Sequence, residues 1–253
     1  MSGGSVQSSV ASNGVCTIEF SHPASNSLPG KLLRELATTI TRCGEDADSS
    51  VIVLRSAGDR AFCAGASFDE LIAIETAGQG LEFFSGFALV INAMRTCPKL
   101  IIGRVQGKAV GGGVGLASAV DYCLATEHAS VKLSELAVGI GPFVVGPAVE
   151  RKIGTSAMSQ LAIDASSWRS AQWAAGHGLF AEVYPSVEEL DAGVAALADR
   201  LAESNPEAMR ELKTIFWAGT EDWDRLLSER AAISGRLVLS AFTRNAIAQF
   251  KAR

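Results

Sequence analysis

The sequence predicts an α/β protein with a parallel sheet in its core and a helical region at its C-terminal end. Runs of apolar and β-branched residues alternate with segments of helical spacing, the pattern of repeated strand–helix units. Glycine-rich turns stand between a strand-like run and the helix that follows it. From about Val187 the strand-like runs stop and helical spacing continues alone. With 253 residues, the chain is long enough for one large domain with a substantial core.

Strands are expected at short apolar runs bounded by turn residues: Val15–Phe20, Ser50–Arg55, Leu100–Val105, Tyr122–Ala125 and Ser130–Leu133. Asn13-Gly14, before the first run, is a hairpin signal. The second run does not alternate with polar residues, which predicts a strand buried on both faces.

Helices are expected where apolar residues recur on neighbouring turns: Leu32–Cys43, Phe68–Glu75, Leu81–Met94, from the glycines at 111–113 to about Ala119, Val187–Glu203, Pro206–Ala218 and Trp223–Phe250. We therefore divide the chain into three parts. Residues 1–14 are expected to form a flexible N-terminus and the first hairpin. Residues 15–186 form the core with the site, and residues 187–253 form a helical oligomerisation region.

Bulk composition narrows the class of protein. The formal net charge is −5 and no basic stripe is present, so nucleic acid is not an expected partner. The longest apolar runs are too short to span a membrane. Five cysteines without a CxxC pair and three histidines without ligand spacing indicate a reduced, cytoplasmic protein and no metal site. A hydrophobic content of 48% and a mean hydropathy of +0.23 predict a buried subunit interface.

Two glycine-centred turns and one acid form the candidate site. The first turn is Ala64-Gly65-Ala66 and the second is Gly111-Gly112-Gly113. Each follows a strand-like run, so both can lie at the same end of one sheet, where open α/β folds bind ligands. Backbone N–H groups at such turns can stabilise a developing negative charge. Glu135 lies among apolar residues, which raises the proton affinity of a carboxylate and suits it to proton transfer near neutral pH.

Each feature also has an ordinary structural interpretation. A glycine turn alone is explained equally well by tight helix–sheet packing, and Glu135 alone could be a solvated loop acid or a helix cap. Phe83, Phe84 and Phe87 could line a pocket or only pack in the core. A nucleotide site is disfavoured because neither GxGxxG nor GxxxxGK is present.

The order and spacing of these motifs resemble the crotonase superfamily, the enoyl-CoA hydratase/isomerase family, from about Val15 to the C-terminus. The motifs that carry the resemblance are Asn26-Ser27-Leu28, the segment from Gly58 to Ala66, Gly107 to Gly113, and Glu135 with Gly139. The resemblance implies a crotonase-like spiral of ββα turns with a C-terminal helical trimerisation region. It also implies an acyl-CoA thioester substrate and a homotrimer or dimer of trimers.

The resemblance further implies the roles of individual residues. The N–H groups of Ala66 and Gly112 would hold the thioester oxygen, and Glu135 would move the proton. Ala64, Gly65, Gly111, Phe83, Phe87 and Gly139 would contact the substrate. No cofactor is implied apart from the coenzyme A that belongs to the substrate.

The chain also departs from the family's pattern. Hydratases of this family hold a water between two glutamates, and Gly115 stands where the first would be. Ser67 replaces an aspartate usual beside the first turn, and Phe143 stands where dienoyl isomerases and dehalogenases carry an acid. An enoyl-CoA isomerase or hydratase with a single catalytic glutamate is therefore the leading hypothesis. The alternatives are a hydratase/dehydratase or decarboxylase for branched, glutaconyl-type acyl-CoA, and a CoA-thioester-binding subunit with little turnover.

Overall fold

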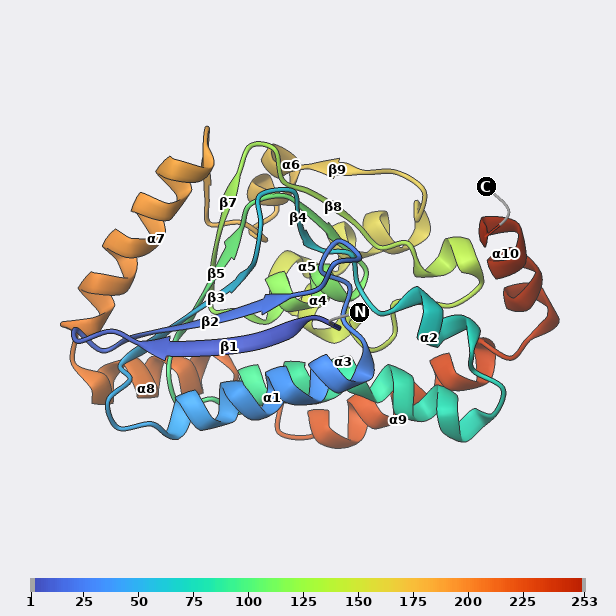
Figure 1. The fold of residues 1–253 in the computed structure, drawn as a ribbon, viewed down its shortest axis with the longest axis horizontal. Helices are drawn as coiled ribbons and strands as arrows, with labels where there is room; N and C mark the ends of the chain where they lie inside the picture. The colour runs from blue at the N-terminus through green and yellow to red at the C-terminus, as the bar shows by residue number, and fades with distance from the viewer. Residues whose placement is uncertain (1–2, 252–253) are drawn as a thin grey trace.

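The computed structural model describes residues 3–251 and contains two β-sheets (Figure 1). The six-stranded sheet has the order β1-β2-β3-β5-β7-β10 and the four-stranded sheet the order β4-β6-β8-β9. The strands are β1 Ser5–Val10, β2 Val15–Ser21, β3 Val51–Ser56, β4 Ala61–Cys63, β5 Ile101–Val105, β6 Lys108–Val110, β7 Tyr122–Thr126, β8 Ser130–Lys132, β9 Arg169–Ser170 and β10 Glu182–Tyr184. The helices are α1 Gly30–Glu45, α2 Phe68–Ile72, α3 Ala77–Thr96, α4 Gly112–Ala119, the 3₁₀ turn η1 Glu135–Val138, α5 Gly146–Ile163, α6 Ala171–Gly176, α7 Val187–Ala202, α8 Pro206–Phe216, α9 Trp223–Leu237 and α10 Ala241–Lys251.

The chain passes through both sheets in each turn of a spiral. It runs from β3 to β4 and then α2 and α3, from β5 to β6 and then α4, and from β7 to β8 and then η1 and α5. Successive turns therefore add β3, β5 and β7 side by side to the large sheet, and β4, β6 and β8 to the small one, all parallel. The predicted α/β class and the spiral of ββα turns are confirmed.

The large sheet is covered on both faces, as the unbroken apolar run of β3 predicts. Ile52 and Leu54 point into the main core, which α1 and α3 also line. Val51 and Val53 point to the opposite face and pack with Leu190 and other apolar residues of α7. These four residues of β3, 51–54, are each 5% exposed or less. Because successive side chains of a strand alternate between faces, only an apolar residue at every position fits this arrangement.

The residues after Val187 are helical, as predicted, and two of these helices pack on the rest of the chain. Helix α7 covers one face of the large sheet, and α9 packs against α3 so closely that a Cβ on Gly80 would lie 2.7 Å from the Gly235 Cα. The single helix predicted over Trp223–Phe250 is wrong. It divides between α9 and α10, where the Ser240 hydroxyl accepts a hydrogen bond from the Thr243 N–H at 3.2 Å and caps the new helix.

The strands that the sequence did not predict have two or three residues each: β4, β6, β9 and β10. Residues 5–10 pair with β2 along its length in an antiparallel hairpin that residues 11–14 close, as the Asn13-Gly14 signal predicts. A periodicity of two is hard to recognise over three residues, and of the three-residue strands only β8 was predicted among those the structure describes.

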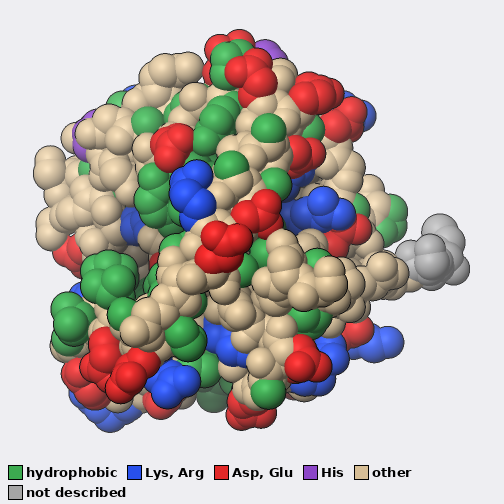
Figure 2. All heavy atoms as spheres, turned by 90° about the vertical axis from the view of Figure 1, so that its left-hand side faces the viewer, with side chains coloured by type: hydrophobic (Ala, Val, Ile, Leu, Met, Phe, Trp, Pro, Cys, Tyr) green, Lys and Arg blue, Asp and Glu red, His purple; other side chains and the backbone are tan. Residues whose placement is uncertain are grey.

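Acidic and basic side chains are interspersed on the face of the molecule shown in Figure 2. Figure 2 shows no continuous patch of Lys and Arg there. In the part of the chain that the structure describes, no helix has the length and apolar character needed to cross a membrane.

Candidate active site

The three candidate motifs follow three adjacent strands of the small sheet. The Ala64–Ala66 turn follows β4, the glycine turn follows β6, and Glu135 follows β8. Because β4-β6-β8 are parallel neighbours, the three segments leave the same end of the sheet and meet there. The expectation that both turns lie at the same end of one sheet is confirmed. The sheet in question is the small one. The strands predicted before the two turns, at 50–55 and 100–105, belong to the large sheet.

The first turn places Gly65 directly against the second. A Cβ on Gly65 would lie 3.0 Å from the Val110 carbonyl oxygen and 3.5 Å from the Gly112 nitrogen, and its φ of +88° is one that favours glycine. The Leu28 N–H donates to the Gly65 carbonyl at 2.8 Å, and the Ser67 N–H donates to the Leu28 carbonyl at 3.3 Å. These bonds fix the turn on both sides of Ala66.

The side chain of Asn26 holds the turn's approach from β4. Its amide donates to the carbonyls of Ala57 and Ala61, each at 2.9 Å, and its oxygen accepts from the His22 N–H at 3.0 Å. The Asn26-Ser27-Leu28 motif therefore stabilises the first turn and the segment that leads to it.

The second turn exposes the start of α4. Gly111 has a φ of +52° and donates its N–H to the Lys132 carbonyl at 2.9 Å, so α4 begins at Gly112. Among residues 3–251, the N–H groups of Gly112 and Ala66 have no hydrogen-bond acceptor. Two free donors at adjacent turns, one at a helix N-terminus, can bind the same oxygen atom as it gains negative charge.

Glu135 is the first residue of η1, and its carboxylate lies against the second turn. A Cβ on Gly111 would be 2.9 Å from Glu135 Oε1, so a side chain at position 111 would displace the acid. Glu135 Oε2 is buried and has no hydrogen-bond partner among the described residues. Burial raises the pKa of this carboxyl from 4.5 to about 7, and its own backbone N–H opposes the shift. A carboxyl with a pKa near neutral can both accept and return a proton.

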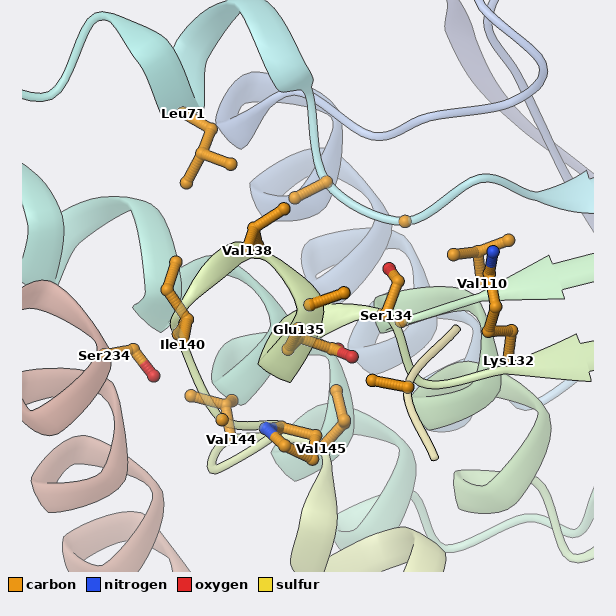
Figure 3. Close-up of a pocket in the computed structure, with 18 of the residues that line it drawn as sticks. Leu71, Val110, Lys132, Ser134, Glu135, Val138, Ile140, Val144, Val145 and Ser234 are labelled. Atoms are coloured by element: carbon orange, nitrogen blue, oxygen red, sulfur yellow. The ribbon is translucent and has the colours of Figure 1, made fainter. Parts of the chain in front are cut away.

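The two turns and Glu135 line one cavity of about 690 Å³. Figure 3 shows the Glu135 carboxylate in this space, bordered by Ser134 and Val145. Of the residues expected to act in catalysis or contact substrate, those that line the cavity are Ala64, Gly65, Ala66, Phe83, Phe87, Gly111, Gly112 and Glu135. Phe87 belongs to the cavity wall and to the main core, so both interpretations of the aromatic cluster hold.

Gly139 is not among the described residues that line the cavity. It ends η1 with a φ of +82°, and its carbonyl accepts a hydrogen bond from the Thr243 hydroxyl of α10 at 3.1 Å. Its position behind the turn supports the segment that carries Glu135, and does not match the expected contact with substrate.

Val145 occupies the space beside Gly115, the position at which the sequence lacks the second acid of the family's hydratases. A Cβ on Gly115 would lie 2.5 Å from Val145 Cγ1 and 2.8 Å from Val145 Cβ. Val145 is 5% exposed and lines the cavity. The glycine at position 115 shows from the sequence that the acid is missing. Nothing in the sequence indicates that an apolar side chain from the start of α5 takes its place.

Two lysines and a tryptophan stand at one side of the cavity. The Nζ atoms of Lys108 and Lys132 lie 5.1 Å and 4.7 Å from the centroid of the Trp168 ring, and Lys132 and Trp168 line the cavity. Neither lysine forms an ion pair with an acid among residues 3–251. The sequence gave no sign of this cluster, because it depends on the pairing of β8 with β6 and β9, and neither β6 nor β9 was predicted.

Comparisons with known proteins agree with this geometry. The profile of the enoyl-CoA hydratase/isomerase family matches residues 10–246. A carnitinyl-CoA dehydratase from Proteus mirabilis is 28% identical over 208 residues, which cover 82% of this chain and 78% of that protein. A hydrolase from Rhodococcus jostii that is named for a bicyclic indene-carboxyl-CoA is 28% identical over 205 residues, 81% of this chain and 78% of that protein.

Solved structures of similar proteins share the fold. An enoyl-CoA hydratase from Bacillus halodurans superposes with a TM-score of 0.88 at 19% identity, covering 96% of this chain and 99% of the other. An enoyl-CoA hydratase from Mycobacterium avium subsp. paratuberculosis gives 0.84 at 25% identity, with 98% and 96% covered. The extent of the family match, over nearly all of the spiral and its site, shows that this chain belongs to the enoyl-CoA hydratase/isomerase family.

Proposed function

We propose that this enzyme moves the double bond of a 3-enoyl-CoA to the 2 position, with Glu135 as its only proton shuttle. The observation that carries the proposal is that Glu135 is the one carboxylic acid among the described residues lining the cavity. Isomerisation needs a single group that removes a proton and returns it nearby. Hydration by two acids would need a second carboxylate, and Val145 fills the space beside Gly115 where one would stand.

The reaction begins with the thioester oxygen between the N–H groups of Ala66 and Gly112. The Glu135 carboxylate removes a proton from C2, and the C–H electrons form a dienolate whose negative charge falls on the thioester oxygen. The two N–H donors stabilise that charge, which is greater in the transition state than in the substrate. Protonated Glu135 then delivers the proton to C4, the double bond forms between C2 and C3, and the carboxylate is regenerated.

The apolar wall of the cavity supports isomerisation over hydration. Phe83, Phe87 and Val145 surround the reacting region and limit the entry of water. Exclusion of water strengthens the hydrogen bonds to the enolate and prevents hydration of the product. At the other side of the cavity, Lys108 and Lys132 flank Trp168 and supply positive charge for the phosphates of coenzyme A.

A panel of two substrates tests the proposal. Purified protein is assayed with a 3-enoyl-CoA for isomerisation and with crotonyl-CoA for hydration. The proposal requires turnover of the first substrate to exceed that of the second by at least about tenfold. Faster hydration would favour a hydratase in which Glu135 Oε2, which has no hydrogen-bond partner within residues 3–251, holds a water. Binding without turnover of either substrate would favour a CoA-thioester-binding subunit.

A double substitution tests the role of the missing acid. Gly115→Glu alone would collide with Val145, so the acid is introduced together with Val145→Ala, and Val145→Ala alone is the control. The double variant should hydrate crotonyl-CoA about tenfold faster than the control, because a second carboxylate can position and activate water. Equal hydration rates would show that the second acid does not decide the reaction.

We also propose that the chain assembles as a homotrimer or a dimer of trimers. Leu212, Ile215 and Phe216 lie on neighbouring turns of α8 and are 45%, 65% and 52% exposed. An apolar stripe of this kind is typical of a protein interface. Light scattering at micromolar concentration tests the assembly, and a monomeric mass would contradict it.

A further inference from the structure

The cavity extends away from Glu135 toward α9, and one polar group is buried in that end. Around it lie apolar side chains from α2, α3 and the segment after η1, among them Leu71, Phe84 and Ile140. Ser234 of α9 lines the same region and is only 1% exposed. Figure 3 shows its hydroxyl on the cavity side of α9, near Ile140 and Val144.

The hydroxyl of Ser234 has hydrogen-bonding capacity to spare. Its one bond in the described structure is to the Arg230 carbonyl of the preceding helical turn, at 3.4 Å. That bond is long for a hydroxyl donor, and it leaves the oxygen's lone pairs unused. Among apolar side chains, a hydroxyl with unused capacity gains from a polar ligand atom that reaches it.

Ser234 is not the residue at the glycine contact between α9 and α3. Gly235, one residue further along α9, packs against Gly80, where a Cβ on Gly80 would lie 2.7 Å from the Gly235 Cα. Gln249 of α10 is the other uncharged polar residue on this side of the cavity, and it is exposed. Ser234 is therefore the buried group that can recognise an atom of the acyl chain.

We propose that Ser234 is a specificity-determining residue for acyl-CoA substrates whose chain carries a hydroxyl or keto oxygen at the end remote from the thioester. The serine accepts a hydrogen bond from a hydroxyl, or rotates to donate one to a keto oxygen. The inference rests on acyl-CoA binding in this cavity, as set out under the proposed function. It does not depend on which reaction Glu135 performs.

Binding of saturated thioesters tests the proposal, because they have no double bond to move. Dissociation constants are measured by calorimetry for hexanoyl-, octanoyl- and decanoyl-CoA and for the same three chains with a terminal hydroxyl. The quantity compared is the ratio of the two constants at each chain length. The variants are Ser234→Ala and, as a matched control, Ser228→Ala on an exposed face of the same helix.

In the wild type, the hydroxylated chain should bind at least as tightly as its unsubstituted partner at one chain length. Ser234→Ala should weaken binding of that hydroxylated chain about tenfold, because its hydroxyl is then buried without a partner. Binding of the unsubstituted chain should change less than about twofold, and Ser228→Ala should leave both constants unchanged.

Two results would overturn the inference alone. The first is that a terminal hydroxyl on the acyl chain weakens binding to the wild type at every chain length. The second is that both series bind but Ser234→Ala does not change the ratio of their dissociation constants. If neither series binds, the proposed acyl-CoA site fails and this inference fails with it.

Discussion

The two sheets of this enzyme divide stability and chemistry between them. The large sheet has strands of five to seven residues at β2, β3, β5 and β7, most of them buried and rich in Val, Ile and Leu. The small sheet has strands of two or three residues, yet each of β4, β6 and β8 ends at a part of the candidate site. The large sheet carries much of the hydrophobic core, while the small sheet aligns three loops that the core alone would not bring together.

Glu135→Gln should produce the largest effect, because it removes the one carboxylic acid that lines the cavity among the described residues. The amide keeps the size of the side chain but cannot accept the proton. Turnover should fall by about 10³–10⁴, the upper part of the range for general acid–base catalysis. Steady-state kinetics measures the loss, and calorimetry with octanoyl-CoA should show unchanged binding.

The exposed Glu127→Gln, just beyond β7, is the matched control and should keep full turnover. If Glu135→Gln retains more than about a tenth of wild-type turnover on the best substrate, Glu135 is not the sole base.

Loss of the Gly112 N–H should have the next largest effect. A Cβ at Gly112 would overlap the Phe87 ring, so the comparison is made in a Phe87→Ala background. In that background Gly112→Pro removes the donor, whereas Gly112→Ala adds a side chain and keeps it. Position 112 is the first residue of α4, where proline is tolerated.

The proline double variant should turn over about 10²–10³ times more slowly than the alanine double variant, the usual cost of one oxyanion donor. Steady-state turnover is measured for both, and circular dichroism verifies that both fold. Equal rates would mean that the oxygen is bound elsewhere.

Two valine substitutions compare the sheets directly. Val53→Ala in β3 and Val131→Ala in β8 remove the same atoms from residues that are 5% and 0% exposed. Each should lower the free energy of unfolding by about 1–3 kcal/mol, measured by urea denaturation. Val53→Ala should leave turnover of the folded enzyme unchanged, while Val131→Ala should lower it severalfold because β8 positions Glu135. A turnover loss for Val53→Ala of the same size would remove the distinction between the sheets.

The last predicted effect is a change of stability with pH. Burial raises the pKa of Glu135 to about 7 in the folded protein, above the ordinary 4.5 of an unfolded chain. Between these values the folded protein holds a proton that the unfolded chain releases, so the contribution of Glu135 to stability is lost as pH rises. Glu135→Gln should therefore gain stability over the wild type between pH 5 and pH 8, by at most about 3 kcal/mol.

Denaturant titrations of both proteins at the two pH values measure this difference, and Glu127→Gln gives the effect of an exposed amide. A stability difference that does not grow with pH would show that the carboxyl is not desolvated. The same titration should appear in catalysis as a rise of kcat/KM with pH through about 7, because the carboxylate is the active form.

The contrast between the sheets also explains what the sequence could predict. A long apolar strand such as β3 leaves a pattern, and so do amphipathic helices and glycine turns, so the class, the order of elements and the two turns were recognisable. Short strands leave a weaker pattern, so β8 was predicted but neither β4 nor β6 was. For the same reason the contact of Val145 with Gly115 and the cluster at Trp168 became visible only in the structure. Both join segments far apart in the chain.

The parallel order β4-β6-β8 has a consequence for how the enzyme becomes active. The donor at Ala66 depends on Leu28, the donor at Gly112 depends on Lys132, and each link closes a long loop of chain. Contacts between distant segments are slow to form, because the entropy of loop closure opposes them until neighbouring structure is in place. Helices can therefore be complete before the two proposed oxyanion donors, at Ala66 and Gly112, lie side by side. Recovery of catalysis during refolding then reports closure of the spiral, whereas the helical signal in far-ultraviolet circular dichroism reports the formation of the helices.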